Sequence, residues 1–220
     1  MFSALLLLIS CVVATLPQQP IYPGLHVVYE DDFNYLNENV WTKLDGFVQT
    51  PYASVCYRAD DVYTADGSLH LRTRRRDSTC TFKGESKNYA FTSGWVDTHS
   101  KRSFRDGLIE VRSKIPPPVN RIWPAVWIIE AANDRDRGKC WPIAEEADIY
   151  EMTGGLGTSP ICGSMHWGYE CNVDRGNKYG CTPRPAEGTY NVYAIRWSQK
   201  EGGYVAWFLN GVEVRMALRA

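Results

Sequence analysis

The stretch from Glu146 to Glu151 constrains the fold of this chain most, because it alternates acidic with apolar side chains. Successive side chains of a strand point to opposite faces, so a strand would place Glu146 and Asp148 together on one face. Glu151 has the wrong parity in a regular strand. One extra residue, a β-bulge at Ile149 or Tyr150, would return Glu151 to the acidic face. Bulges are over-represented beside active sites, so this segment predicts a bulged strand in a cleft.

Three carboxylates in line on one face repel each other, which predicts that at least one has a raised pKa. Glycosidic bond hydrolysis needs this condition, because one carboxylic acid protonates the leaving oxygen while a second carboxylate attacks or activates water. A calcium-binding acidic cluster and a solvated edge strand are the alternative interpretations. The spacing alone does not choose among the three.

The flanking residues add a resemblance to a known family. Trp141-Pro142 followed by Glu-Ala-Asp-Ile-Tyr-Glu resembles the signature of family 16 glycoside hydrolases, in the bulged form of the laminarinase-like endo-β-1,3-glucanases. The resemblance implies that Glu146 is the nucleophile, that Asp148 assists it and that Glu151 is the acid/base. It also implies retention of configuration through a glycosyl-enzyme intermediate, and an all-β fold, an antiparallel β-sandwich of jelly-roll type.

Four further residues are candidates for substrate binding. Trp123 and Trp127 share parity, so in a strand both rings would face the same way, either into the core or into a cleft. Their segment resembles the Trp-Pro-Ala-x-Trp segment of the family, which implies that both rings line the glucan cleft. Trp141 precedes the acidic strand and is a third candidate. His166 lies in a His-Trp-Gly triplet that resembles the strand beside the catalytic one, and we expect it near Glu151.

The amino-terminal apolar run, residues 2–14, is too short to span a bilayer. Small residues near its end are typical of a secretory signal peptide, while a buried amino-terminal helix is the alternative. We therefore predict a signal peptide over residues 1–14, a single domain over residues 15–220 and an extracellular location. Six of the seven cysteines follow the signal, which predicts three disulfides, and the sequence does not choose among the 15 possible pairings.

Composition narrows the choice of partners. The net charge of −1 argues against nucleic acid or an anionic membrane as partner. The 8 Trp and 13 Tyr suit a carbohydrate cleft, although β-sandwich cores are also rich in aromatic residues. We expect a monomer that acts on a polysaccharide, a β-glucan, without a catalytic metal or organic cofactor. A structural calcium ion is common in the family, and its ligands are not identified.

Local patterns predict several further elements. Residues 27–34 resemble the opening strand of the family. Asp66-Gly67 and Asn210-Gly211 each predict a hairpin turn. The polar and basic segment 73–90 predicts a solvated loop held by a disulfide. Because relatives continue for several strands beyond residue 220, we also expect the sandwich to lack its C-terminal strands, which would expose sheet edges.

Two other functions remain open at this stage. The first is a non-catalytic β-glucan recognition protein on the same fold, although such proteins characteristically lose the catalytic glutamates. The second is hydrolysis of another polysaccharide, namely mixed-linkage glucan, agarose or carrageenan. The bulged motif disfavours strict lichenases, which use the unbulged spacing. A reducing-sugar assay against laminarin, lichenan and agarose separates these functions.

Overall fold

The structure is a computed structural model, and nearly the whole of the described chain is strand or connecting loop. It describes residues 22, 24–49, 54–82, 84–116, 122–131, 139–152, 160–183, 188–200 and 203–218. The predicted signal peptide lies outside these residues. No helix within the described residues is long and apolar enough to cross a membrane.

One antiparallel sheet contains the acidic segment. Its strands run in the order β12-β11-β10-β9. They are β9 (Ala125–Ile129), β10 (Glu146–Glu151), β11 (Ile161–His166) and β12 (Asn177–Thr182). The acidic strand β10 is therefore an inner strand, flanked by β9 and β11, and the solvated edge strand considered from the sequence is excluded.

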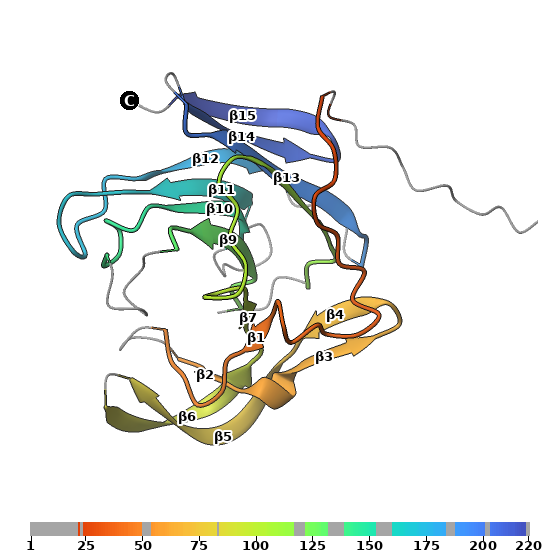
Figure 1. Cartoon of the computed structure of the whole chain (residues 1–220). Helices are drawn as coiled ribbons and strands as arrows, with labels where there is room; N and C mark the ends of the chain where they lie inside the picture. The colour runs from red at the N-terminus through yellow and green to blue at the C-terminus, as the bar shows by residue number, and fades with distance from the viewer. Residues whose placement is uncertain are drawn as a thin grey trace, which may run out of the picture.

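A second antiparallel sheet packs against the first and closes the core. Its order is β15-β14-β13-β8, and Figure 1 shows it stacked on the β9–β12 sheet. Its strands are β8 (Gly107–Ser113), β13 (Asn191–Ser198), β14 (Tyr204–Leu209) and β15 (Val212–Leu218).

Apolar side chains of both sheets form the main core. The buried residues of this core are Ile115, Ala147, Ile149, Tyr150, Met152, Ile161, Tyr193, Ile195 and Trp207. Ala147 and Ile149 come from the alternate positions of β10, as the sequence predicts, while Tyr193 and Trp207 come from the facing sheet. The predicted antiparallel jelly-roll sandwich is thus confirmed.

A third sheet lies apart from the sandwich, at the bottom of Figure 1. It contains β2 (Cys56–Tyr57), β6 (Glu85–Ser93) and β5 (Thr73–Phe82) in that order. The prediction of a solvated loop over residues 73–90 is therefore wrong, because β5 and β6 pair as a long antiparallel hairpin. Alternate residues of β5 are half-buried, so the basic segment also has a strand pattern.

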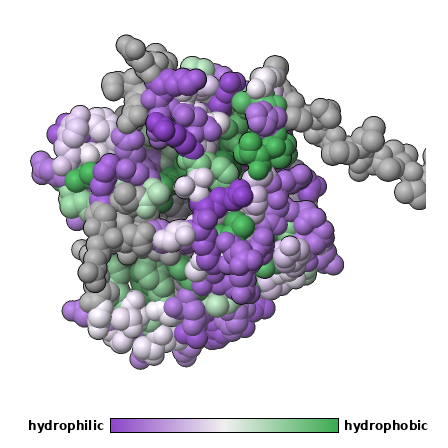
Figure 2. Space-filling model, viewed as in Figure 1, coloured by the Kyte–Doolittle hydropathy of each residue, from purple (hydrophilic) through white to green (hydrophobic). Residues whose placement is uncertain are grey.

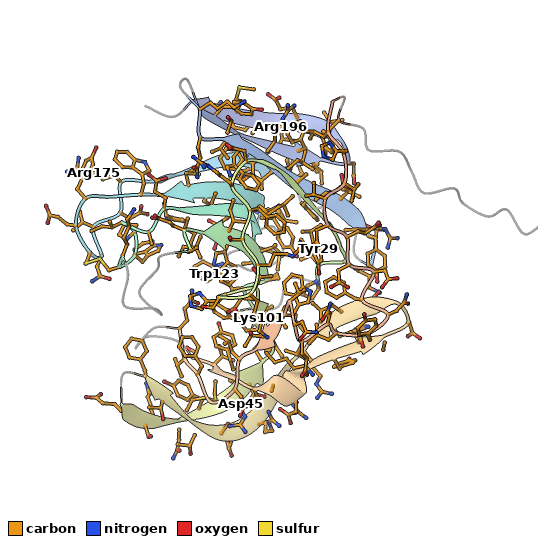
Figure 3. All side chains as sticks on the ribbon, in the orientation of Figure 1. Tyr29, Asp45, Lys101, Trp123, Arg175 and Arg196 are labelled. Carbon is orange, nitrogen blue, oxygen red and sulfur yellow. A yellow bond between two sulfur atoms is a disulfide. The ribbon has the colours of Figure 1, made fainter. Side chains whose placement is uncertain are left out.

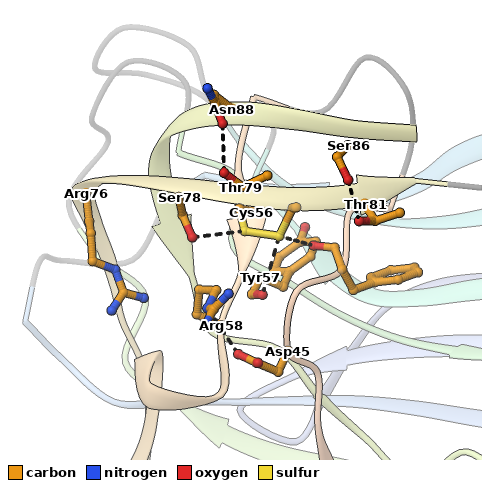
Figure 4. Close-up of a disulfide and its surroundings, with 12 residues drawn as sticks. Asp45, Cys56, Tyr57, Arg58, Arg76, Ser78, Thr79, Thr81, Ser86 and Asn88 are labelled. Carbon is orange, nitrogen blue, oxygen red and sulfur yellow. Dashed lines mark hydrogen bonds and ion pairs between the residues drawn. A yellow bond between two sulfur atoms is a disulfide. The ribbon is translucent and has the colours of Figure 1, made fainter. Parts of the chain in front are cut away.

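A disulfide holds this hairpin to β2. The Cys56–Cys80 bond ties β2 to β5, and Figure 4 shows Ser78, Thr79 and Thr81 along the same strand. The other two disulfides join Cys140 to Cys171 and Cys162 to Cys181, so all six cysteines after the predicted signal are paired. The prediction of three disulfides is confirmed, and the pairing comes from the tertiary structure.

Short elements connect these sheets. They are β1 (Thr42–Lys43) paired with β7 (Val96–Asp97), a 3-10 turn (Ala59–Asp61), and the hairpin of β3 (Val62–Ala65) and β4 (Ser68–Leu71). Asp66 and Gly67 both have positive φ angles, as do Asn210 and Gly211. Both predicted hairpin turns are confirmed, since a type I′ turn requires positive φ at its two central residues.

The expected opening strand over residues 27–34 is wrong, because this segment contains no strand. Instead it is held by side chains, with the Trp41 indole donating a 2.7 Å hydrogen bond to Asp31. Val27 and Val28 are exposed, so the valine pair contributes nothing to the core. Figure 2 shows that the viewed face is mainly hydrophilic with smaller apolar areas.

Candidate active site

The acidic strand β10 has the predicted bulge. Asp148 is opposite Trp127 of β9, whereas Tyr150 is opposite Val126, so Ile149 is the extra residue between the two registers. The register with β11 shifts in the same interval. Because of the bulge, the consecutive residues Ile149 and Tyr150 are both buried in the core. The bulge also returns Glu151 to the same side of the strand as Asp148. All three carboxylates therefore interact electrostatically.

Asp148 is the buried centre of this group, at 2% exposure. Its backbone carbonyl accepts a 2.7 Å hydrogen bond from the indole of Trp207, which belongs to the facing sheet. Gly163 leaves room for that indole, since a Cβ at this position would lie 2.2 Å from the ring. The core of the sandwich thus fixes the backbone at the centre of the acidic strand.

His166 contacts the opposite side of Asp148. The register places His166 opposite Glu146, and its Nε2 lies 3.2 Å from Asp148 Oδ2. The sequence predicts His166 near Glu151; the register places it at the Glu146 end of the strand, and its charge also acts on Glu151. Its Nδ1 is 2.7 Å from Oδ2 of Asp174, which comes from the loop between β11 and β12.

Glu151 is held at the other end of the group. The Trp123 indole donates a 2.9 Å hydrogen bond to Glu151 Oε1, and the Ser164 hydroxyl donates a 3.4 Å bond to Oε2. Trp123 precedes β9 and is 60% exposed, so it belongs to the surface of the site and not to the core. Figure 3 shows Trp123 between the β9–β12 sheet and the β5–β6 hairpin.

The carboxylates have perturbed ionisation. Burial, assisted by the charge of Asp148, raises the pKa of Glu146 to about 7. The same two causes raise the pKa of Glu151. The contact with Asp148, followed by that with Asp174, raises the pKa of His166 to about 9. Near neutral pH the site therefore has a positively charged imidazolium, and the two glutamates retain protons to higher pH than free carboxyl groups.

The other predicted aromatic residues lie around this group. Trp141 packs against the His166 ring at a centroid distance of 5.5 Å, and its side chain hydrogen-bonds Glu146. Trp127 is half-buried and its ring meets Trp95 edge-on at 4.8 Å. The structure thus brings Trp123, Trp127 and Trp141 to the acidic strand, but Trp123 and Trp127 do not share one strand.

Three residues of the site were not predicted from the sequence. Ser164 has the parity of His166 within β11, so the alternation of that strand was a usable signal. Asp174 lies in an irregular loop and Trp207 is 59 residues from Asp148, and neither position shows a local pattern. The contacts of these two residues depend on the fold alone.

Among the described residues, one group has metal-binding geometry. The ligand atoms of Glu146, Asp148 and His166 all lie within 4.8 Å of one another. Calcium takes six to eight oxygen ligands, and this set offers two carboxylates and an imidazole. It does not fit the structural calcium ion of the family, and no catalytic step is assigned to calcium.

The arrangement supports acid/base and nucleophilic chemistry. Two partly buried glutamates flank a buried aspartate on one strand, and indole, hydroxyl and imidazole groups orient them. Two carboxyl groups with raised pKa can provide one proton donor and one nucleophile on the same strand.

Comparisons with known proteins find relatives by sequence and by fold. No family model matches the chain. The chain is 24% identical over 214 residues to glucan endo-1,3-beta-glucosidase A1 of Niallia circulans, with 89% of this chain and 30% of that protein covered. It is 25% identical to a beta-1,3-glucan-binding protein of Penaeus monodon, with 79% and 58% covered. The chain thus spans less than two thirds of either relative.

Solved structures share the fold. A glycoside hydrolase family 16 endo-glucanase from Bacteroides ovatus, in complex with the ligand G4G3G-2F-DNP, superposes with a TM-score of 0.67. The sequences are 22% identical, and the alignment covers 87% of this chain and 78% of that one. At this identity the likeness establishes the jelly-roll fold.

Proposed function

We propose, from the premise that this chain is a laminarinase-like member of glycoside hydrolase family 16, that it hydrolyses internal bonds of β-1,3-glucan. The observation that carries the proposal is the bulge of β10, which brings Glu151 to the side of Glu146 and Asp148. A solvated acidic patch would gain nothing from this irregularity. A retaining glycosidase needs two carboxyl groups close together across one bond.

The roles follow from exposure and hydrogen bonding. Glu146 is half-exposed beside Trp141 and His166, and it is the proposed nucleophile. Glu151 is the proposed acid/base, as the family resemblance implies, and the Trp123 indole and the Ser164 hydroxyl hold its carboxyl group. Asp148 is too buried to touch a sugar, so it acts by its charge on both neighbours.

The proposed reaction retains the anomeric configuration. Glu151 donates its proton to the glycosidic oxygen while the Glu146 carboxylate attacks the anomeric carbon, which gives a glycosyl-enzyme ester. Glu151, now ionised, removes a proton from water, and that water hydrolyses the ester and regenerates both groups. His166, charged between Asp148 and Asp174, favours the ionised form of Glu146.

The aromatic side chains fit a glucan chain. The half-exposed ring of Trp127 and the exposed ring of Trp123 offer flat apolar surfaces next to Glu151 and Asp148. Sugar rings have apolar faces that such surfaces cover. Export from the cytoplasm is also proposed, and the three disulfides support it because such bonds persist in oxidising compartments.

Glu146→Ala tests the proposal. Hydrolysis of laminarin should be lost while the melting temperature is kept, and azide should restore turnover with a product of inverted configuration. Azide fills the space of the missing carboxylate and attacks from the same side. The matched control is Glu213→Ala, which removes an exposed glutamate of β15 and should leave activity unchanged. Full activity of Glu146→Ala would refute the assignment.

A second function is favoured by one comparison. The Penaeus monodon relative is a beta-1,3-glucan-binding protein, and this chain would share that role if it bound laminarin without cleaving it. The presence of Glu146, Asp148 and Glu151 argues against this alternative. Reducing-sugar release from laminarin, lichenan and agarose separates hydrolysis from binding and also identifies the preferred polysaccharide.

A further inference from the structure

The group of Glu146, Asp148 and His166 has features that hydrolysis does not require. The two carboxylates and the imidazole come together at one place, with their ligand atoms within 4.8 Å. In the proposed hydrolysis the imidazole acts only through its charge, and neither ring nitrogen contacts the bond that breaks. The orientation of this imidazole, and the environment of the aspartate it faces, each point to a cation.

His166 is oriented by a carboxylate on its far side. Its Nδ1 pairs with Asp174 at 2.7 Å, which leaves Nε2 facing Asp148 at 3.2 Å. Asp174 is itself fixed, because its Oδ1 accepts hydrogen bonds from the backbone N–H groups of Trp167 and Gly176. Histidines that bind metals nearly always donate their second N–H to a carboxylate or carbonyl in this way.

The loop that carries Asp174 is cross-linked to the segment just before the acidic strand β10. Cys171 is bonded to Cys140, and the backbone N–H of Asn172 donates a 2.9 Å hydrogen bond to the carbonyl of Trp141. The position of Asp174 is therefore built into the fold, and Nε2 of His166 is aimed at Asp148 before any ligand arrives.

The surroundings of Asp148 Oδ2 are a second, independent observation that points to a cation. Asp148 is 2% exposed, and no described residue makes a well-aligned hydrogen bond to this oxygen. His166 Nε2 is close enough to attract it, at 3.2 Å, but not at a hydrogen-bonding angle. Zinc between the two atoms would take the place of the Nε2 proton, so binding releases that proton and should strengthen as the pH rises.

We propose that Glu146, Asp148 and His166 form a binding site for a zinc ion, and that zinc bound there inhibits hydrolysis. Zinc bonds to nitrogen and oxygen are about 2.0–2.2 Å long, so neighbouring ligands of a tetrahedral ion lie roughly 3.4 Å apart. The 3.2 Å between Nε2 and Oδ2 is close to this value. The ligand atom of Glu146 lies within 4.8 Å of the other two and provides the third ligand, and water takes the fourth position.

The ligand types select zinc over the hard cations. Two carboxylates neutralise the charge of one divalent ion, while the imidazole suits zinc and copper and not calcium or magnesium. The inhibition rests on the proposed function, because the ion would occupy the carboxylate of the proposed nucleophile. The binding of zinc does not depend on that function.

Isothermal titration of the purified chain with zinc chloride tests the site. One ion should bind, and His166→Ala should weaken binding at least 100-fold. Asp174 supports His166 but does not itself bind the ion. Asp174→Asn should therefore weaken zinc binding about 10–100-fold, the usual effect of losing such a supporting carboxylate. The matched control is His70→Ala, which removes a histidine stacked on Tyr63 in the β3–β4 hairpin and should leave binding unchanged.

Undiminished zinc affinity in His166→Ala would overturn the proposal, and so would equal affinity for calcium. Circular dichroism verifies the fold of each variant, and Glu146→Gln gives a second test at a more exposed ligand, with weaker zinc binding expected. In the laminarin assay zinc should act as a competitive inhibitor that a chelator removes. A chain that binds zinc through His166 but does not cleave laminarin would refute the proposed function and retain the site.

Discussion

Two aspartates are buried among the residues that the structure describes, and their surroundings are opposite in charge. Asp148 in β10 is 2% exposed and is flanked by Glu146 and Glu151, with one histidine against it. Asp61, before β3, is fully buried and is surrounded by arginines. Both residues are carboxylates removed from water, so the comparison isolates the effect of the neighbours.

Arginines stabilise the charge of the second aspartate. Arg74 Nε lies 2.7 Å from Asp61, and Arg72 and Arg76 also pair with it. The hydrogen bond from Arg76 also holds the pKa of neighbouring Asp60 well below its usual range. These pairs join β5 and the residue between β4 and β5, Arg72, to the turn before β3.

The acidic strand has the reverse arrangement. The pKa of Glu146 is raised to about 7 by burial and by Asp148, so the fold there opposes ionisation. A buried carboxylate matched by cations indicates a structural role, whereas like charges held together at a cleft indicate chemistry. The two sites should therefore differ in what a substitution damages.

The largest expected effect is on stability, from Asp61→Ala. Removing the buried acceptor leaves three arginine side chains without their shared partner, and breaking a buried pair costs about 3–5 kcal/mol. The arginines are 30–43% exposed, so water compensates in part and the lower end of that range is expected. Urea unfolding measures the loss. A change below 1 kcal/mol would remove the structural role.

The next effect is on turnover, from Asp148→Asn. Loss of its negative charge lowers the pKa of Glu146 and Glu151, so the acid limb of the pH–rate profile should move to lower pH. The rate at the optimum should fall about 10- to 100-fold, which is one to two pKa units in free energy. If the profile overlays that of the parent protein, Asp148 is structural and the contrast with Asp61 fails.

A smaller effect separates the two tryptophans. Trp123→Ala should weaken laminarin binding with little change in melting temperature, since the ring is 60% exposed. Stacking of a nucleic-acid base on an aromatic ring is worth about 1–3 kcal/mol, and we take this scale for a sugar face. Trp127→Ala should also lower the melting temperature, because its ring packs on Trp95. Calorimetry with and without laminarin measures both.

The smallest effect is the dependence of stability on pH. The pKa of His166 is raised to about 9 and that of Glu146 to about 7, so the folded state holds both protons more tightly than the unfolded state. The resulting stability is complete below the unfolded values and is lost as pH rises through the folded ones. Melting temperature should fall by about 2–8 °C between pH 6 and 9. His166→Gln should reduce this fall.

Local patterns were sufficient where periodicity and turn chemistry act over a few residues. The alternation in β10, its bulge and the two Gly-containing hairpin turns were predictable, because side-chain parity and positive φ depend on adjacent residues. The family resemblance of the acidic segment added the sandwich, and it also implied the roles that are proposed for the carboxylates. The failures were also local, since residues 27–34 resemble a strand but form none and residues 73–90 form a hairpin.

Only the tertiary structure determined which distant groups meet. The arginines of β5 look like a solvated run in the sequence, yet Asp61 pairs with Arg74 and Arg76 because the hairpin folds back over the turn before β3. Asp174 reaches His166 through a loop cross-linked by Cys140–Cys171, and Trp207 reaches Asp148 from the facing sheet. Such contacts depend on sheet order and disulfide pairing, which no short-range pattern encodes, because the interactions that determine them act between residues far apart in the chain.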